Sequence, residues 1–185
     1  MSFEAASEAM IVTPEQEAEL KAIAVSRAPE DLAAVDTAET EEKLFYALPS
    51  GAMAAFHLEK YDYAGELAEK ALALAPSFER NWNFGNAIHF GHIVVGLVAL
   101  HNDDLSAAVC ELEKAGATPG SPQLDSFGPT MQLAKALLRR GESEAVLAYL
   151  QQCRIFWKMG DVWLDLWEQK IRAGKVPNFF MHSYR

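Results

Sequence analysis

Apolar residues recur every three or four positions along most of the chain, with polar residues between them. This spacing is typical of helices that bury one face. No stretch alternates apolar and polar residues with an enrichment in β-branched side chains, the pattern expected of strands. The sequence therefore predicts an all-α protein.

The N-terminal part carries one clear helix start. Thr13, Pro14 and Gln16 are typical of an N-cap, a first helical residue and a capping-box partner, so they predict a helix over 14–26. The following residues, 27–39, are expected to form a linker.

A second start lies at Thr40, which would cap a helix that carries Leu44, Phe45 and Leu48. The Pro-Ser-Gly sequence at 49–51 should break or kink this helix. Proline has no backbone donor, and its ring clashes with the preceding turn.

The segment 61–76 introduces a pattern that returns later in the chain. It opens on an aromatic residue, Tyr61, carries small residues at Ala64 and Ala71, and ends at Pro76. Small residues also precede it at helical spacing, at positions 52 and 55. Two helices of a hairpin approach closely where such short side chains meet.

The pattern returns twice. In its second copy, Gly96 and Ala99 take the small positions of the first helix. Leu105, Ala108 and Ala115 take the positions of the second helix, and Pro119 ends the copy. The third copy is degenerate, because Leu137 replaces a small residue and Ser143 replaces the aromatic residue. Its other positions are Ala134, the Gly141-Glu142 turn, Val146, Leu150 and Cys153.

These residues resemble the tetratricopeptide repeat (TPR) family over about residues 45–157, and from Ser121 onward the chain is also similar to uncharacterised bacterial TPR-like proteins. The resemblance implies a short α-solenoid of about three TPR-like helical hairpins with an N-terminal helix and a C-terminal capping helix. A single hairpin cannot bury its apolar face, so neighbouring hairpins must stack.

The repeat spacing is irregular. Ala64 and Ala108 lie 44 positions apart, and Ala108 and Val146 lie 38 apart, against about 34 in a regular TPR. We expect the first excess, 77–87, to lengthen the opening helix of the second hairpin. The second excess, 116–127, should be a loop that ends where Asp125 or Ser126 caps the next helix.

A last helix is predicted over 161–173, with Asp161 as its cap and Gly174 at its end. Trp163 and Trp167 lie four positions apart and share a face. An amphipathic helix here would cover the open end of the array.

Charge divides the chain into two parts. The net charge is −10, and residues 1–42 hold 11 acids against Lys21 and Arg27. We therefore predict an acidic N-terminal segment with one helix (1–42), either a solvated leader or an arm for a basic partner, and a nearly neutral repeat domain (43–185). The absence of a clustered basic surface argues against nucleic acid as a partner.

Location is inferred from the cysteines and the N-terminus. Cys110 and Cys153 lie in helical patterns without metal or redox spacing and are expected to be buried free thiols, which suits a reducing cytoplasmic compartment. The start of the chain lacks the apolar run of a signal peptide. The most apolar stretch, 93–100, is shorter than the roughly 20 residues that span a bilayer, so no membrane partner is expected.

Few residue patterns point to chemistry. His89 and His92 lie three positions apart on a helix and could chelate a metal, but an interface or core role is the simpler interpretation. No nucleophile motif or phosphate-binding loop occurs. We therefore predict no enzymatic activity, no catalytic residue and no cofactor.

TPR arrays typically bind peptides or helices on the concave surface of their first helices. This resemblance implies a non-enzymatic protein–protein interaction module, a scaffold or adaptor. Alternatives are a homodimeric structural protein, joined through aromatic residues of its last helix, or a metal-binding protein using His89 and His92. The implied peptide-binding residues are Phe56, His57, Asn86, His89, Phe90, Lys135 and Arg139. The two basic residues among them belong to a group that could receive a carboxylate.

Overall fold

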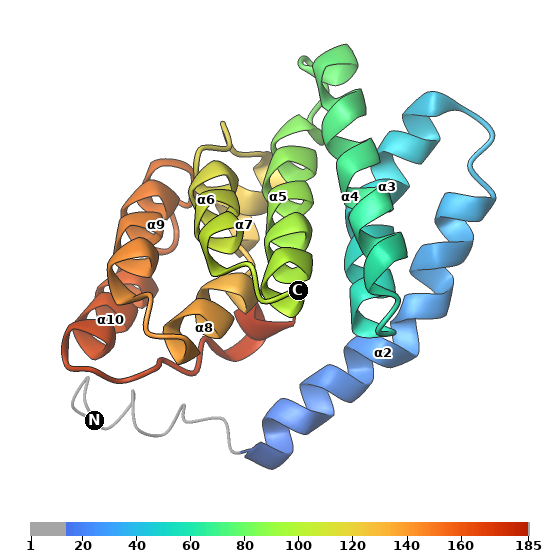
Figure 1. Cartoon of the computed structure of the whole chain (residues 1–185). Helices are drawn as coiled ribbons and strands as arrows, with labels where there is room; N and C mark the ends of the chain where they lie inside the picture. The colour runs from blue at the N-terminus through green and yellow to red at the C-terminus, as the bar shows by residue number, and fades with distance from the viewer. Residues whose placement is uncertain (1–13, 185) are drawn as a thin grey trace.

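The structure, a computed structural model, describes residues 14–184, and every regular element within that range is helical. This confirms the predicted all-α class for the described residues. Figure 1 shows the helices in a row, from α2 and α3 at one end to α10 at the other. They are α2 (Pro14–Asp36), α3 (Glu41–His57), α4 (Tyr61–Leu74), η1 (Ala75–Phe78), α5 (Phe84–His101), α6 (Leu105–Gly116), α7 (Pro122–Phe127), α8 (Gln132–Arg139), α9 (Ser143–Phe156), α10 (Asp161–Arg172) and η2 (Phe180–Ser183).

Small residues of the predicted pattern lie where helices touch. Ala64 and Ala108 are completely buried. A methyl group at Gly96 would lie 2.4 Å from Leu133 Cδ2 and 3.0 Å from Glu111 Cβ, so α5 meets both α8 and α6 at this glycine. Short side chains at these contacts bring the helix axes close together.

The expected linker at 27–39 is wrong, because α2 continues to Asp36. Its second half buries Ala28 and Leu32 in the same core as α3. Gly51 makes this contact close, since a methyl group there would lie 2.4 Å from Val35 Cγ2. Tertiary packing thus extends the helix through Pro29. Residues 1–13, the rest of the predicted acidic segment, lie outside the described residues.

The sequence predicted a break or a kink at 49–51, and the break is wrong. Helix α3 runs without interruption from its cap at Thr40, whose hydroxyl accepts from Lys43 N at 3.1 Å. Pro49 cannot donate to the carbonyl of Phe45, four residues earlier. The side-chain amide of Asn83 donates to that carbonyl instead, at 3.3 Å. A residue from a distant turn therefore supplies the donor that proline lacks.

We expect Asn83→Ala to lower the free energy of unfolding by about 1–3 kcal/mol, because it leaves a buried carbonyl without a donor. In a Pro49→Ala background the new backbone N–H can donate to the carbonyl of Phe45. The cost of Asn83→Ala should therefore be about 1 kcal/mol smaller in this background. Urea unfolding followed by circular dichroism measures both costs. Equal costs in the two backgrounds would show that Asn83 does not replace the missing donor.

Only the last four of the extra residues between the first two hairpins, 84–87, lie in α5, which begins at Phe84. Residues 77–83 form the end of the 3-10 helix η1 (Ala75–Phe78) and a turn, so most of the excess does not lengthen α5. Phe78 of η1 stacks on Phe45 with ring centroids 4.5 Å apart. This turn therefore packs on α3, and it positions the Asn83 side chain beside Pro49.

The first helix of the third hairpin consists of two pieces. Ser121, rather than Asp125 or Ser126, caps the short helix α7 by accepting from Leu124 N at 2.9 Å. The chain turns at Gly128 and Pro129, and α8 starts only at Gln132. Both pieces pack against α5. The second spacing excess thus contains a helix rather than only a loop.

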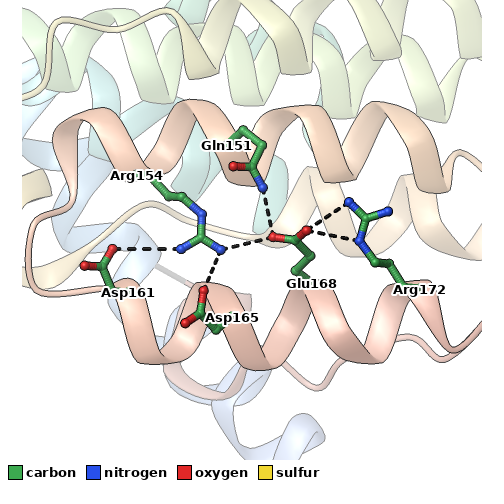
Figure 2. Close-up of polar contacts among 6 residues, drawn as sticks. All are labelled: Gln151, Arg154, Asp161, Asp165, Glu168 and Arg172. Atoms are coloured by element: carbon green, nitrogen blue, oxygen red, sulfur yellow. Dashed lines mark hydrogen bonds and ion pairs between the residues drawn. The ribbon is translucent and has the colours of Figure 1, made fainter.

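Helix α10 packs on α9 and begins after Gly160, which takes the cap position expected of Asp161. Figure 2 shows how Arg154 of α9 lies among acids of α10, with Arg154 Nη2 2.8 Å from Asp165 and 3.0 Å from Glu168. Glu168 also accepts from Arg172 and from Gln151. These ion pairs attach the last helix to the array.

Candidate functional site

His89, one of the implied binding residues, is completely buried in α5. Its Nδ1 lies 3.3 Å from the carbonyl of Ala115, and its Nε2 accepts from Thr130 N at 3.3 Å. The imidazole must therefore carry its proton on Nδ1. Burial lowers the pKa of His89 to about 4, with a smaller effect from His92. Both ring nitrogens are engaged, so neither is free for a metal.

Asn86 is also buried, at 2% exposure. Its amide donates to Asn83 and to Gln123, and its oxygen accepts from Ser121 at 2.7 Å. The amide joins α5 to the start of α7. In this arrangement its polar atoms hold the fold together and are not presented to a ligand.

Lys135 and Arg139 of α8 form a cluster with a carboxylate of α2. Lys135 Nζ lies 2.6 Å from Glu17 Oε1, and Arg139 Nη2 lies 3.5 Å from the same oxygen. The Lys135 side chain is only 9% exposed. Tyr184 Oη donates to the same Glu17 oxygen at 3.3 Å. A buried lysine thus holds a carboxylate that α2 supplies.

The electrostatics of this cluster favour an ionised Glu17. Burial alone would raise the pKa of Glu17, but the hydrogen bond and charge of Lys135, together with the charge of Arg139, lower it below its usual value. Burial, and then the negative charge of Glu17, raise the pKa of Tyr184. The phenol therefore remains a donor to the carboxylate.

His57 borders the cluster at the end of α3. Its Nε2 lies 3.1 Å from Gln132 Oε1, and its ring lies 6.1 Å from that of Tyr184. Burial lowers the pKa of His57, although the bond to Gln132 opposes this. Phe56 packs edge-on to Tyr61 at 5.3 Å. Of the seven implied residues, Phe56, His57, Lys135 and Arg139 thus lie toward one end.

The other three residues lie deeper. Asn86 and His89 are buried, and Phe90 is half-buried with its ring edge-on to His89 at 5.1 Å. The concave row implied by the resemblance is therefore divided into a core part and an accessible end that carries Arg139.

The C-terminal segment covers the break between α7 and α8. Met131 N donates to the carbonyl of His182 at 2.6 Å, and His182 Nδ1 lies 2.8 Å from the carbonyl of Pro129. The His182 ring packs on Trp157 and Trp167 at 4.8 and 5.3 Å. The backbone groups freed by the break are thus bonded by the tail of the same chain.

Sequence reasoning missed Glu17, His182 and Tyr184, which lie far along the chain from the helices they contact. The acidity of the first 42 residues was the available signal for Glu17. The signal for the tail was weaker, because aromatic and histidine residues after Gly174 have no helical spacing.

The remaining reactive groups are separated. His92 Nδ1 lies 2.6 Å from Glu111, away from the bonds of His89. Cys153 is buried as predicted, and burial raises the pKa of its thiol, but the prediction for Cys110 is wrong because it is exposed. Within residues 14–184, no group of three or more His, Cys, Asp or Glu side chains could hold a metal.

Helix α5 is the one described helix that is long and apolar enough to cross a membrane, with a mean hydropathy of 1.3 over 18 residues. Half of that window is buried inside the protein, and core helices of soluble proteins have the same composition. This is weak evidence for a membrane span.

Trp167 is 3% exposed and Trp163 is half-buried, so only part of the aromatic surface expected for self-association is accessible. Exposed apolar residues near this end include Ile155, Met159 and Val162, at 70%, 72% and 58%. Self-association stays a prediction.

Comparison of the chain with protein-family models, with curated proteins and with solved structures gives no match.

Proposed function

We propose that this protein is a non-enzymatic interaction module, a scaffold or adaptor, that binds an acidic helix or peptide at the accessible end of its inner face. The observation that carries this proposal is the carboxylate of Glu17 held by Lys135 and Arg139. A site that receives an acid from α2 has the charge and geometry to receive one from a partner.

The attachment of α2 supports exchange with a partner. No residue between Pro14 and Arg27 is buried, whereas Ala28 and Leu32 are. The first half of α2 therefore rests on polar contacts such as Glu17–Lys135 rather than on the core. The net contribution of such a partly buried ion pair is small, because the cost of removing both charges from water offsets much of their attraction. A partner segment with an acid and an apolar face would compete for the same cluster.

We also propose that the helical hairpins are TPR-like. The buried small residues at Ala64 and Ala108 support this interpretation, whereas the division of the third hairpin into α7 and α8 departs from the family pattern. The non-enzymatic assignment is supported by His89, whose two nitrogens are engaged, and by Cys153, whose burial keeps it a neutral thiol.

Two variants should change partner binding in opposite directions. Lys135→Met with Arg139→Ala removes the cluster, and capture of partners should fall at least tenfold, the loss expected for charge-assisted hydrogen bonds of about 1.5–3 kcal/mol. Glu17→Gln weakens the internal competitor and should raise capture severalfold. Quantitative mass spectrometry of proteins retained by the full chain measures both.

Arg140→Ala is the matched control, because Arg140 pairs with Asp103 at 2.7 Å outside the cluster. It should leave capture unchanged. Circular dichroism checks that each variant keeps its helix content. If the double variant and Glu17→Gln retain the same proteins as the unaltered chain, in the same amounts, the proposed site is wrong.

A further inference from the structure

A second accessible surface lies where α2 and α3 meet, at the right of Figure 1. Tyr46 of α3 lines a hollow of about 490 Å³ between the two helices. Tyr46 and His57 lie 11 positions apart on α3, which corresponds to about 16 Å along the helix axis. The aromatic end of the hollow therefore lies well away from the Lys135 cluster, although Asp31, on the α2 side of the hollow, interacts with the charge of His57.

An exposed aromatic pair stands beside this hollow. The rings of Tyr46 and Trp82 stack with centroids 5.6 Å apart and an angle of 20°. They are 36% and 55% exposed. Burial of aromatic side chains stabilises a fold strongly, so a stacked pair left at the surface is available to a partner.

Hydrogen bonds hold the Tyr46 side chain of this pair in place. Asn81 Nδ2 donates to Tyr46 Oη at 2.7 Å, and Tyr46 Oη lies 2.9 Å from Glu42 Oε1. Trp82 follows Asn81 directly in the turn before α5. A partner would therefore meet a positioned Tyr46 ring with Trp82 stacked on it, which reduces the entropy lost on binding.

The surroundings are acidic. The segment 30–46 holds six acids and one lysine. That lysine, Lys43, also lines the hollow, and its ammonium pairs with Glu39 at 2.9 Å. Asp31 lines the hollow, and no hydrogen bond or ion pair from the described residues reaches its carboxylate. Partial burial, followed by the charge of Glu30, raises the pKa of Asp31, and the charges of Arg27 and His57 offset this only in part. The hollow thus contains a carboxylate that a cation would stabilise.

We propose that this surface binds an arginine-bearing basic segment of a partner protein. A guanidinium is planar, stacks on aromatic faces and pairs with carboxylates through several donors. Here the Trp82–Tyr46 platform supplies the aromatic face, and Asp31 supplies a carboxylate in the adjoining hollow. The alanine-rich lining of the hollow would contact the aliphatic part of the arginine side chain.

The test uses the full chain and fluorescein-labelled octapeptides that alternate alanine with arginine, lysine or glutamate. Fluorescence anisotropy at about 0.1 M salt, where surface charges are partly screened, gives each Kd. The arginine peptide should bind at least threefold more tightly than the lysine peptide, because guanidinium stacks better on aromatic rings. The glutamate peptide should not bind.

Variants locate the binding. Trp82→Ala should weaken arginine-peptide binding by about fivefold to tenfold, within the range of cation–π contacts, and Asp31→Asn should weaken it severalfold. Glu66→Gln on α4 removes an equal charge from an exposed distant position and should change Kd less than twofold. Trp82 is exposed, so its removal should leave the helix content and melting temperature unchanged.

Several results would overturn the proposal. One is that Trp82→Ala and the unaltered chain bind the arginine peptide equally well. Another is that Glu66→Gln weakens binding of the arginine peptide as much as Asp31→Asn does. A third is that the unaltered chain associates with itself and that Trp82→Ala abolishes this association. The Lys135→Met/Arg139→Ala variant should bind the arginine peptide normally. Failure at one surface can thus be distinguished from failure at the other.

Discussion

Gly85→Ala is expected to lower the free energy of unfolding by about 3 kcal/mol or more, the range of severe core overpacking. A methyl group at this position would lie 1.8 Å from the carbonyl oxygen of Gly120 and 2.4 Å from its carbon. The obstacle is backbone, so no change of rotamer relieves it. The loop that contains Gly120 must move away from α5.

That loop has little freedom to move. Thr118 Oγ1 donates to the carbonyl of Gly85 at 2.8 Å and accepts from Gly120 N at 3.2 Å. Gly120 has φ +83°, which favours glycine, and a methyl group on it would lie 2.8 Å from Phe156 Cβ. A shift of the loop would also disturb Ser121, the cap of α7.

Helix propensity alone would make Gly85→Ala stabilising, because alanine in a helix is favoured over glycine by about 1 kcal/mol. Gly65→Ala in α4 is therefore the matched control. Its added methyl group would meet only Val98 Cγ1, at 3.9 Å, so it should stabilise the protein by up to about 1 kcal/mol. Urea unfolding measures both variants. A stabilising Gly85→Ala would show that the loop yields easily.

Local signals predicted most of the helices, because caps and periodicity depend on residues close in sequence. Thr40 caps α3, and Tyr61 opens α4, as expected. The error at Pro49 has a different origin. The donor that replaces its missing N–H belongs to Asn83, 34 positions later. No local rule contains that partner, so the expected break could not be avoided.

The candidate site was predictable only in part, for a similar reason. Helical spacing brought Lys135 and Arg139 to one face, and their attraction for a carboxylate follows from their chemistry. Whether the face is open depends on Glu17 and Tyr184, which approach from near the two ends of the described residues. Such long-range contacts have no periodic pattern in the sequence.

Acidification from pH 7 to pH 4.5 should remove about 2 kcal/mol of stability through His89 alone, and about 3 kcal/mol once its protonation is complete. Burial lowers the pKa of His89 to about 4, from 6.5. Below pH 6.5 the unfolded chain binds a proton that the folded protein excludes. The contribution of neutral His89 to stability is therefore fully present above pH 6.5 and is lost as the pH falls toward 4.

The geometry explains this cost. The neutral ring donates from Nδ1 to Ala115 and accepts at Nε2 from Thr130 N. A proton on Nε2 would face the Thr130 N–H, so one bond would become a repulsion in a site without water access. Since Thr130 lies at the break between α7 and α8, protonation should loosen the third hairpin first.

The measurement is urea unfolding of the unaltered chain and of His89→Gln at several pH values between 7 and 4.5. The variant should be less stable at pH 7 by about 2–4 kcal/mol, because it disturbs two buried bonds. The stability difference between the two proteins should narrow by about 2 kcal/mol at pH 4.5, since glutamine does not titrate. His57→Gln is the control, because the pKa of His57 is also lowered but its ring is not fully buried. Parallel pH profiles for His89→Gln and the unaltered chain would show that His89 is not the group that makes the fold sensitive to acid.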